Sequence, residues 1–424
     1  MSTRSLLLFA CVVVTALGAS ATRAYAQPAP SPSAAVTPAA TPTAGTKPVP
    51  APSASAAATP TPSPTPYKLI TLGGSVDTGL TSVFGTDQAR FVNGNPARVF
   101  DAANGPFADY NSSRVIAPAN DFNTVPVLQN AILNFTLNGP FIGAHIEYGF
   151  GTDFDAVASN GQTRSGSGPV QAYLQAVKGP VTLLAGKFST LAGAEVIESP
   201  LNTNYSRSFT FGNAVPFTHT GVRLTYAYNP KLSIIVGANN GWDDWKFTGK
   251  KKTLEGGLAI TPSPGYGLTL QTYNGEDFAV FGKPAILSNR MLYDGVLTVH
   301  ATSALTLVGN YDNGTQLADR TGAFTTAHYN AIAGYATYQF SSLYALSLRK
   351  ESFHDNNGFR SGIVQRFQSS TATIAYTPNP NYIFRAEYRL DGSDGNNFTF
   401  RNDVRNVGRA HQPSLGLEAI VKFP

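Results

Sequence analysis

The sequence has 424 residues, only 13% of them charged, and a formal net charge of +5. The length exceeds that of one typical soluble domain, and the charged fraction is well below the roughly one quarter found in ordinary globular proteins. The Lys and Arg residues form no stripe of the kind that binds nucleic acid, and the many Gly, Asn, Thr, Tyr and Phe residues favour strands and turns over helices.

Residues 1–26 have the pattern of a secretory signal peptide. Arg4 gives a positive start, residues 6–17 form an apolar run, and Ala-Tyr-Ala at 24–26 is a small-x-small cleavage site. The apolar run is shorter than the about 20 residues that a spanning helix needs. The only cysteine, Cys11, lies in this segment, so the mature chain has no thiol for a disulfide or a thiolate metal site.

Residues 27–66 form a Pro/Ala/Ser/Thr-rich segment. They contain twelve prolines, and their only charged residue is Lys47. Such a composition cannot bury enough apolar surface to offset the entropy lost on ordering, so a disordered, extended linker is predicted. Two roles stay open: a tether that crosses the periplasm and contacts peptidoglycan, or a simple linker.

From residue 67 to residue 424 the chain alternates between apolar and polar side chains. It contains no run of 18 apolar residues, which excludes a transmembrane helix there. In the stretches 382–391 and 415–423, Phe384, Tyr388 and Leu417 fall on a face predicted to contact lipid. The polar side chains predicted to face a lumen in these stretches are Arg385, Glu387, Arg389 and Glu418.

The connections between the predicted strands alternate between short and long. Seven tight turns alternate with eight longer polar loops, which gives fifteen connections and sixteen strands. Short turns at one end and long loops at the other are typical of an outer-membrane barrel, whereas a soluble sandwich has no reason to segregate its loops. The predicted fold is therefore all-β: a transmembrane antiparallel β-barrel of about sixteen strands, over residues 67–424. The long loops are predicted near 86–122, 155–168, 191–218, 243–251, 276–289, 313–325, 354–366 and 392–411.

Aromatic residues gather beside the short turns, as at Phe141, Tyr344, Tyr376, Tyr382 and Phe423. Amphipathic rings at strand ends suit the headgroup layers of a membrane, although Tyr and Phe are also good strand formers. This placement favours a multi-pass protein of the bacterial outer membrane, with the lipids of that membrane as partners.

Other local signals are weaker. Three lysines at 250–252 follow Trp242, Trp245 and the pair Asp243-Asp244 in a predicted external loop, where the lysines either contact lipopolysaccharide phosphates or are simply solvated. The six histidines form no metal-binding pair, and the sequence DGSDGNN at 391–397 does not fit a calcium loop. No metal, cofactor or enzymatic activity is predicted.

The most informative stretch is GKFSTLAGAEVIESPLNTNYSRSF at 186–209, which runs from a strand into the third long loop. This stretch, continued by PFTHTGVRLTY, resembles the OmpL-like putative β-barrel porins. The resemblance implies an outer-membrane porin with no catalytic residues. It rests on Gly186, Lys187, Phe188, Gly193, Glu195, Asn204, Tyr205, Ser206 and Arg207, and on Pro216, Phe217, Thr218, His219, Gly221 and Val222.

A charge-poor chain that concentrates charges in one loop suggests a pore constriction. A sixteen-stranded barrel leaves a water-filled channel, and opposed acidic and basic side chains in it filter solutes by charge. The sequence AEVIES is predicted to form a helical turn that presents Glu195 and Glu198. The side chains predicted to oppose them are Lys187, Arg207 and Arg223. In the alternative, the loop packs outside the barrel and Glu195 simply pairs with Arg207, and His219 holds the base of the loop in either case.

These observations predict a porin that allows passive diffusion of small hydrophilic solutes or ions through the outer membrane of a Gram-negative bacterium. Two alternatives stay open: an adhesin or envelope tether anchored by the barrel, without channel activity, and a barrel enzyme that acts on lipids. A homo-oligomer remains open, because trimers are common among sixteen-stranded porins only by analogy of fold.

Overall fold

The computed structural model describes residues 69–83, 127–157, 166–247, 251–278, 287–318, 325–358, 360, 364–394, 398–399 and 408–423. The signal peptide predicted at 1–26 and the linker predicted at 27–66 lie outside these residues. So do the lysine at position 250 and the whole of the first long loop, predicted near 86–122.

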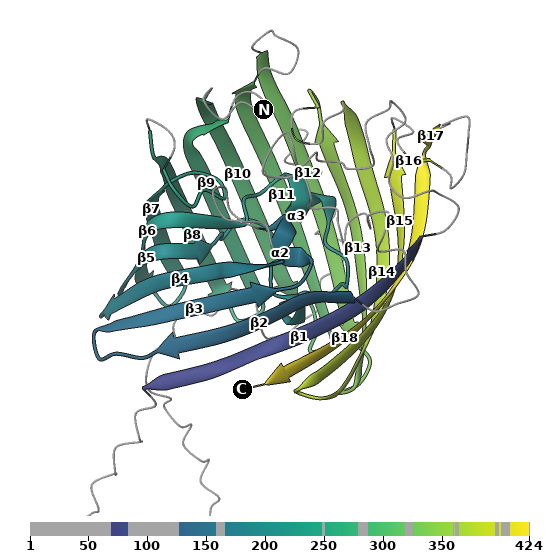
Figure 1. Cartoon of the computed structure of the whole chain (residues 1–424), viewed down its shortest axis with the longest axis horizontal. Coiled ribbons are helices and arrows are strands. Elements are labelled where there is room, and N and C mark those ends of the chain that lie inside the picture. The colour runs from purple at the N-terminus through teal and green to yellow at the C-terminus, as the bar shows by residue number, and fades with distance from the viewer. Residues whose placement is uncertain are drawn as a thin grey trace, which may run out of the picture.

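Sixteen antiparallel strands close into one barrel, which confirms the predicted fold and strand number (Figure 1). Each strand pairs with its neighbours in sequence, and β1 pairs with β18 to close the ring. The strands of the barrel are β1 (Ile70–Val83), β2 (Val127–Leu137), β3 (Ile142–Phe150), β4 (Ser167–Lys178), β5 (Val181–Ser189), β6 (Thr218–Asn229), β7 (Leu232–Asn239), β8 (Thr253–Ser263), β9 (Tyr266–Phe278), β10 (Leu287–His300), β11 (Leu305–Ala318), β12 (Thr325–Gln339), β13 (Tyr344–Asp355), β14 (Gln365–Asn379), β15 (Tyr382–Ser393) and β18 (His411–Phe423).

The long connections are shorter in places than predicted. The strands β9 and β11 continue to Phe278 and Ala318, into the loops expected to start at 276 and 313. Within the last long loop, β16 (Phe398–Thr399) and β17 (Gly408–Arg409) form a separate two-stranded hairpin that the sequence analysis did not predict. Strand ends are hard to place from alternation alone, since polar residues suit both a loop and a strand that rises above the membrane.

The barrel exposes its apolar side chains and buries its polar ones. Leu417 and Tyr388 are 52% and 48% exposed, whereas Glu387 is 3% exposed. A soluble barrel would show the reverse, so the outer face is suited to lipid. In the part of the chain that the structure describes, no helix is both long enough and apolar enough to span a membrane.

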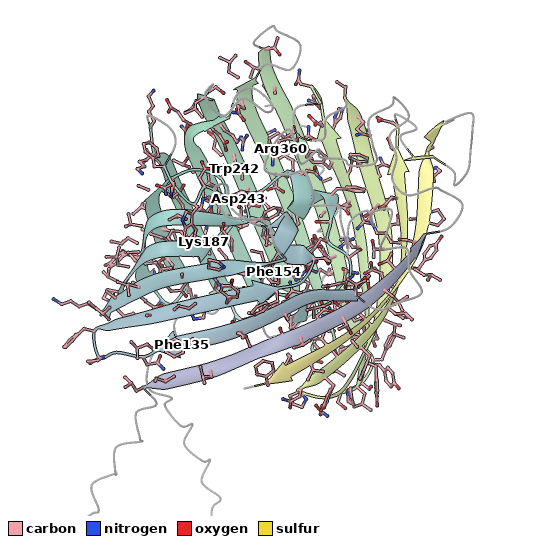
Figure 2. All side chains as sticks on the ribbon, viewed as in Figure 1. Phe135, Phe154, Lys187, Trp242, Asp243 and Arg360 are labelled. Atoms are coloured by element: carbon pink, nitrogen blue, oxygen red, sulfur yellow. The ribbon has the colours of Figure 1, made fainter. Side chains whose placement is uncertain are left out.

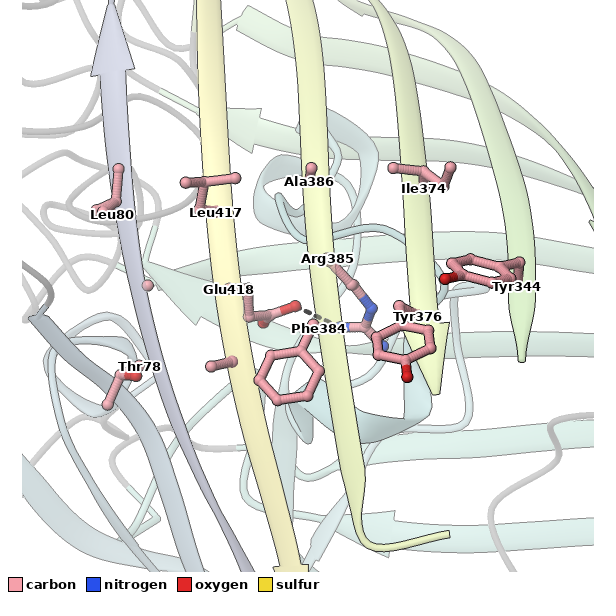
Figure 3. Close-up of a pocket in the computed structure, with 12 residues that line it drawn as sticks. Thr78, Leu80, Tyr344, Ile374, Tyr376, Phe384, Arg385, Ala386, Leu417 and Glu418 are labelled. Atoms are coloured by element: carbon pink, nitrogen blue, oxygen red, sulfur yellow. Dashed lines mark hydrogen bonds and ion pairs between the residues drawn. The ribbon is translucent and has the colours of Figure 1, made fainter. Parts of the chain in front are cut away.

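Aromatic rings cluster on the outer face beside the short turns. The rings of Tyr344 and Tyr376 stack with their centroids 5.0 Å apart, and Phe384 lies beside Tyr376 at 6.2 Å. These rings border a shallow groove that crosses the outer face of β13, β14, β15, β18 and β1 (Figure 3). Their position agrees with the girdle expected at a membrane interface.

The interior of the barrel is occupied by residues 190–217, which connect β5 to β6 and are called the inner segment below. The segment contains a short 3₁₀ helix, η1 (Ser199–Leu201), and a helix of five residues, α3 (Phe209–Asn213). Figure 1 shows α3 inside the ring of strands. It contacts β12, β13 and β14, whereas the short helix α2 (Asp153–Ala156) of the β3–β4 connection contacts β2, β3 and β4.

An apolar core fixes the inner segment to the barrel wall. Phe209 is fully buried and stacks on Phe367 of β14, with ring centroids 4.6 Å apart and planes inclined by 10°. The side chain of Ser208 caps α3 by accepting a hydrogen bond from the backbone N–H of Phe211. Burial of one such phenyl ring contributes about 1.5–3 kcal/mol, so this contact favours an ordered segment.

Candidate functional site

The inner segment crosses the barrel from its base at β5 and β6 to the opposite wall. The backbone N–H of Gly193 donates to Asp294 Oδ1 of β10 at 2.9 Å. The backbone N–H groups of Thr210 and Tyr205 donate to Glu351 of β13 at 3.1 Å and to Glu387 of β15 at 2.8 Å. Buried backbone groups need such partners, and here the far wall supplies them.

Glu195 is bound by an arginine that the sequence analysis did not single out. Its Oε1 lies 2.8 Å from Nη1 of Arg349 on β13, and its Oε2 accepts hydrogen bonds from the backbone N–H and hydroxyl of Ser208. Arg349 also donates to the carbonyl of Ser206. The alternation YALSLRKESFHD does place Arg349 and Glu351 on the inward face, and that signal could have found them. The expected pairing of Glu195 with Arg207 is absent from the described residues.

Arg207 binds main-chain carbonyls. Its Nε and Nη2 donate to the carbonyls of Val196 and Ile197 at 3.1 and 2.9 Å. Asn202 accepts from the N–H of Val196 and donates to the carbonyls of Val196 and Glu198. These side chains take the hydrogen bonds that a helix would make, so the predicted helical turn at 194–199 is wrong and η1 starts only at residue 199.

Glu198 lies at the N-terminal end of η1, beside the carboxyl of Glu147 on β3. Burial and the negative charge of Glu147 raise the pKa of Glu198 to about 8, although Arg207 acts in the opposite direction. Two carboxyls in contact disfavour double ionisation, so Glu198 is largely protonated at neutral pH.

Arg223 and Lys187 were expected to stand on the same side of the pore, but the register separates them. Lys187 pairs with Thr220, and Arg223 is three residues further along β6, on the opposite face. Arg223 points inward, with a 2.8 Å ion pair to Glu255 and its guanidinium 4.2 Å from the ring of Phe188.

Lys187 lies on the outer face, where loop residues cover it. Its Nζ donates to the carbonyl of Pro169 at 2.8 Å and lies 5.8 Å from the ring centroid of Trp245. A lysine in this position cannot oppose Glu195 or Glu198 across the lumen. The expectation for Lys187 is wrong because Lys187 shares the face of its partner Thr220, which is opposite to the face of Arg223.

The four other residues predicted to face the lumen are all buried and form two groups. Arg385 is paired with Glu418 at 2.6 Å (Figure 3), and Arg385 also donates to the carbonyl of Ser199 at 3.3 Å. Arg389 pairs with Asp391 at 2.6 Å and donates to the carbonyl of Arg207, while Glu387 accepts from the inner segment as described above. Most of these charges fasten the inner segment to the wall.

The loop between β7 and β8 folds over the base of the inner segment. Asp243 accepts hydrogen bonds from the N–H groups of Phe217 and Thr218 at 2.9 and 2.8 Å, and it is 2% exposed. Burial is the main cause that raises the pKa of Asp243 to about 6. His219 contacts the carbonyl of Gly241 in the same loop at 3.2 Å. The expectation of an external Asp243-Asp244 pair is therefore wrong, since both side chains are buried.

Trp242 of this loop lies between two arginines from other parts of the barrel. The guanidinium carbons of Arg290 and Arg360 lie 4.7 and 5.2 Å from its ring centroid. Figure 2 labels Trp242, Asp243 and Arg360 in this region. Burial and the charge of Arg290 lower the pKa of Arg360 to about 10, so it stays cationic at neutral pH.

Towards the short turns the interior is lined by hydroxyls, called the hydroxyl band below. Thr337 pairs directly with Thr306 and Ser347, and its Oγ1 lies 3.1 Å from the Ser347 hydroxyl. His300 contacts the Thr306 hydroxyl at 3.0 Å. Thr136, Thr225, Thr269 and Thr298 occupy equivalent inward positions on their own strands. This surface suits water and neutral polar solutes.

A closed sixteen-stranded barrel with an apolar exterior and a polar interior defines the class of outer-membrane channels. The chain belongs to the family described as "Putative beta-barrel porin-2, OmpL-like", which matches residues 69–423. This confirms the resemblance found in the sequence. Membership places the chain in the outer membrane as a channel for passive diffusion, and family and fold are those of a channel rather than an enzyme.

Solved porin structures share the fold at low sequence identity. The outer-membrane channel DcaP of Acinetobacter baumannii is 12% identical, with 84% of this chain and 97% of that chain covered and a TM-score of 0.55. An anion-selective porin from Comamonas acidovorans is 11% identical, with 84% and 99% covered and a TM-score of 0.56. The trimer form of OmpT from Vibrio cholerae is 12% identical, with 84% and 99% covered and a TM-score of 0.51. No curated protein matches the sequence.

Among the described residues there is no group of three or more His, Cys, Asp or Glu side chains that could hold a metal ion.

Proposed function

We propose that the inner segment forms the constriction of the pore, past which small hydrophilic solutes and ions diffuse. One observation carries the proposal: the segment leaves the barrel wall at β5 and β6 and is hydrogen-bonded to β10, β13 and β15 on the other side. A loop anchored at both walls reduces the cross-section that a solute can use. The charges around it are then those of Glu195, Glu198, Arg207 and Arg223, without Lys187.

The constriction is held at a further point, near the place where β1 pairs with β18 to close the barrel. The hydroxyl of Tyr205 accepts a hydrogen bond from Gln129 on β2 at 2.7 Å and lies 2.9 Å from the hydroxyl of Thr81 on β1. A Cβ atom at Gly416 on β18 would lie 2.4 Å from the Tyr205 ring, so only glycine leaves room for it there. The inner segment is therefore held at its base on β5 and β6, on the opposite wall, and where β1 pairs with β18.

Single-channel conductance of the full chain in planar bilayers tests the proposal. Deletion of residues 199–213 should raise the conductance and admit larger neutral sugars in a liposome-swelling assay, because the obstacle is removed. Gly416→Val should act in the same direction by displacing Tyr205. Gly334→Val is the matched control, since a Cβ there has only the carbonyl of Lys350 nearby, at 4.0 Å. Unchanged conductance in both the deletion and Gly416→Val would exclude the segment as the constriction.

The remaining partners belong to the same proposal. The aromatic girdle and apolar exterior support contact with outer-membrane lipids, lipopolysaccharide included, and residues 27–66 are proposed to contact peptidoglycan. A homo-oligomer is supported by the trimer form recorded for OmpT of Vibrio cholerae. We propose no catalytic activity. Light scattering of the full chain in detergent measures the oligomeric state, and a monomeric mass would exclude the oligomer.

A further inference from the structure

The charges of the chain are sorted unevenly between its interior and the rest of the molecule. The chain as a whole has a formal net charge of +5. Among the described residues, however, the buried charged side chains comprise fourteen acidic and eight basic ones. Without Lys187 and the two carboxyls of the β7–β8 loop, Asp243 and Asp244, twelve acidic and seven basic side chains remain, so the interior is acidic although the protein is basic.

Most inward arginines are already neutralised by a neighbouring carboxylate. Those within ion-pair distance of a carboxylate are Arg223, Arg290, Arg349, Arg385 and Arg389. A close pair presents little net charge to a passing ion, because the two fields cancel beyond a few ångströms. The field of the pore is therefore set mainly by the remaining carboxyls, because they outnumber the two other buried arginines, Arg207 and Arg360.

Two such carboxylates lie side by side in the wall behind the inner segment. Asp294 of β10 and Asp312 of β11 are directly paired in the register. Asp294 Oδ1 accepts from the N–H of Gly193 and from the side chain of Asn310, both at 2.9 Å. Within the described part of the chain, no Lys or Arg side chain forms an ion pair with either carboxyl. The two carboxyls are in direct contact, which disfavours double ionisation, so the pair carries a single negative charge.

We infer that the pore passes cations in preference to anions, with small inorganic cations and organic ammonium compounds as its favoured solutes. The inference rests on the proposed function, because it requires solutes to pass the inner segment. This uncompensated negative charge lies in the wall beside the ion path, where it raises the local concentration of cations and lowers that of anions. Asp294 and Asp312 are the residues assigned the largest part of this selection.

The anion selectivity of one porin with a similar fold does not contradict the inferred cation preference. The Comamonas acidovorans porin is anion-selective, but at 11% identity the likeness concerns the barrel and not the side chains inside it. Selectivity is a property of the charges that line a pore, and the same barrel carries either sign.

Reversal potentials across a tenfold KCl gradient test the inference, with the full chain in a planar bilayer at neutral pH. For a pore permeable only to cations, the reversal potential would be about 59 mV in magnitude. Its sign is the one set by cation flow down the gradient. The unaltered protein should show that sign. The double variant Asp294→Asn/Asp312→Asn should move the potential towards zero, and Asp312→Asn alone should move it less.

The matched control is Arg290→Gln/Asp277→Asn, which removes one charge of each sign from a compensated pair that is not among the anchors of the inner segment. Its reversal potential should equal that of the unaltered protein. If the unaltered protein conducts normally but its reversal potential is zero or has the sign of anion flow, the inference is wrong. If the potential of the double variant does not move, the assignment to Asp294 and Asp312 is wrong. Absence of conductance, or no response to the deletion of residues 199–213, contradicts the proposed function instead.

Discussion

The middle of the barrel interior is built from ion pairs and aromatic rings, whereas the hydroxyl band near the short turns carries almost no charge. In the middle, Arg349 alone contacts Glu195, Ser206 and Thr371. In the hydroxyl band, Thr337 contacts one other hydroxyl, that of Ser347. The first region is an interlocked structure of buried ion pairs, and the second is a wall that water can cover.

This difference changes how charged residues in a pore sequence should be understood. A charge in the lumen of a barrel has two uses: it acts on solutes, or it holds another part of the chain in place. Here Glu195, Glu387 and Arg389 serve the inner segment, since each binds its backbone or side chains. Only carboxylates left outside such pairs are free to act mainly on solutes.

The largest expected effect follows from removing Arg349 from the middle of the barrel interior. Arg349→Gln leaves Glu195 and Glu351 buried without their main cation, and removal of one partner from a buried pair costs about 3–5 kcal/mol. The free energy of unfolding in detergent, measured with urea, should fall by that order. The control is Lys350→Gln. Lys350 follows Arg349 in the sequence, but its side chain is exposed and donates only to the Ser370 hydroxyl. Equal effects of both variants would show that the middle is not interlocked.

The second prediction separates the lipid face from the hydroxyl band. Leu417→Arg should destabilise the barrel by up to about 2–4 kcal/mol if it lies near the midplane of the bilayer. Thr269→Arg, on the inward face, should cost much less because water can solvate the new charge. Glu418 is unsuitable for this comparison, since an arginine there would face Arg385. Urea unfolding in lipid vesicles measures both variants, and a larger loss for Thr269→Arg would reverse the assigned faces.

The third prediction uses the pH dependence of one carboxyl in the middle region. Burial and Glu147 raise the pKa of Glu198 from its ordinary 4.5 to about 8, with Tyr173 and Arg207 also near it. Glu198 is thus neutral below that pH in the folded protein and gains its charge above it. Cation preference in reversal-potential measurements should therefore rise as the pH increases through about 8.

Glu198→Gln should remove this step and leave the preference at pH 6 unchanged. The raised pKa also means that folding is favoured when Glu198 is protonated, so its contribution to stability declines as the pH rises from about 4.5 to about 8. A pH step that persists in Glu198→Gln would assign it to another group.

The smallest effect is expected in the hydroxyl band. Thr337→Val removes the hydrogen bond to Ser347 but keeps the shape of the side chain, which should cost about 0.5–1.5 kcal/mol. Single-channel conductance should stay nearly the same, because no charge is altered. A large change in conductance would show that this band, and not the inner segment, limits flow.

The fold could be predicted from the sequence because it depends on a repeated physical requirement. Every strand must present apolar side chains to lipid and polar ones to water, which leaves a period of two in stretches such as 382–391. Closure and the segregation of long loops then follow from the need to pair every backbone group in the membrane. The predicted sixteen strands depend only on these features and are confirmed. The porin family was indicated by the motif at 186–222 and is confirmed by the match over residues 69–423.

The interior of the site could be predicted only in part, since it depends on contacts between residues far apart in sequence. The third long loop was identified, with Glu195 and Arg207 in it, but the partner of Glu195 is Arg349 on β13. No local pattern specifies that pairing. Lys187 was misplaced for a related reason: its face depends on the register between β5 and β6, and not on its charge.

The pocket that holds the Tyr205 side chain has a consequence for the order of folding. It is formed by Thr81 of β1, Gln129 of β2 and Gly416 of β18, so it includes both the first and the last strand of the barrel. Contacts of such large sequence separation form late, after the entropy of closing the intervening chain has been lost. This pocket is complete only when β1 has paired with β18. The tyrosine can therefore dock only in a closed barrel, and its fluorescence or protection from labelling would report the moment at which the two ends of the barrel meet.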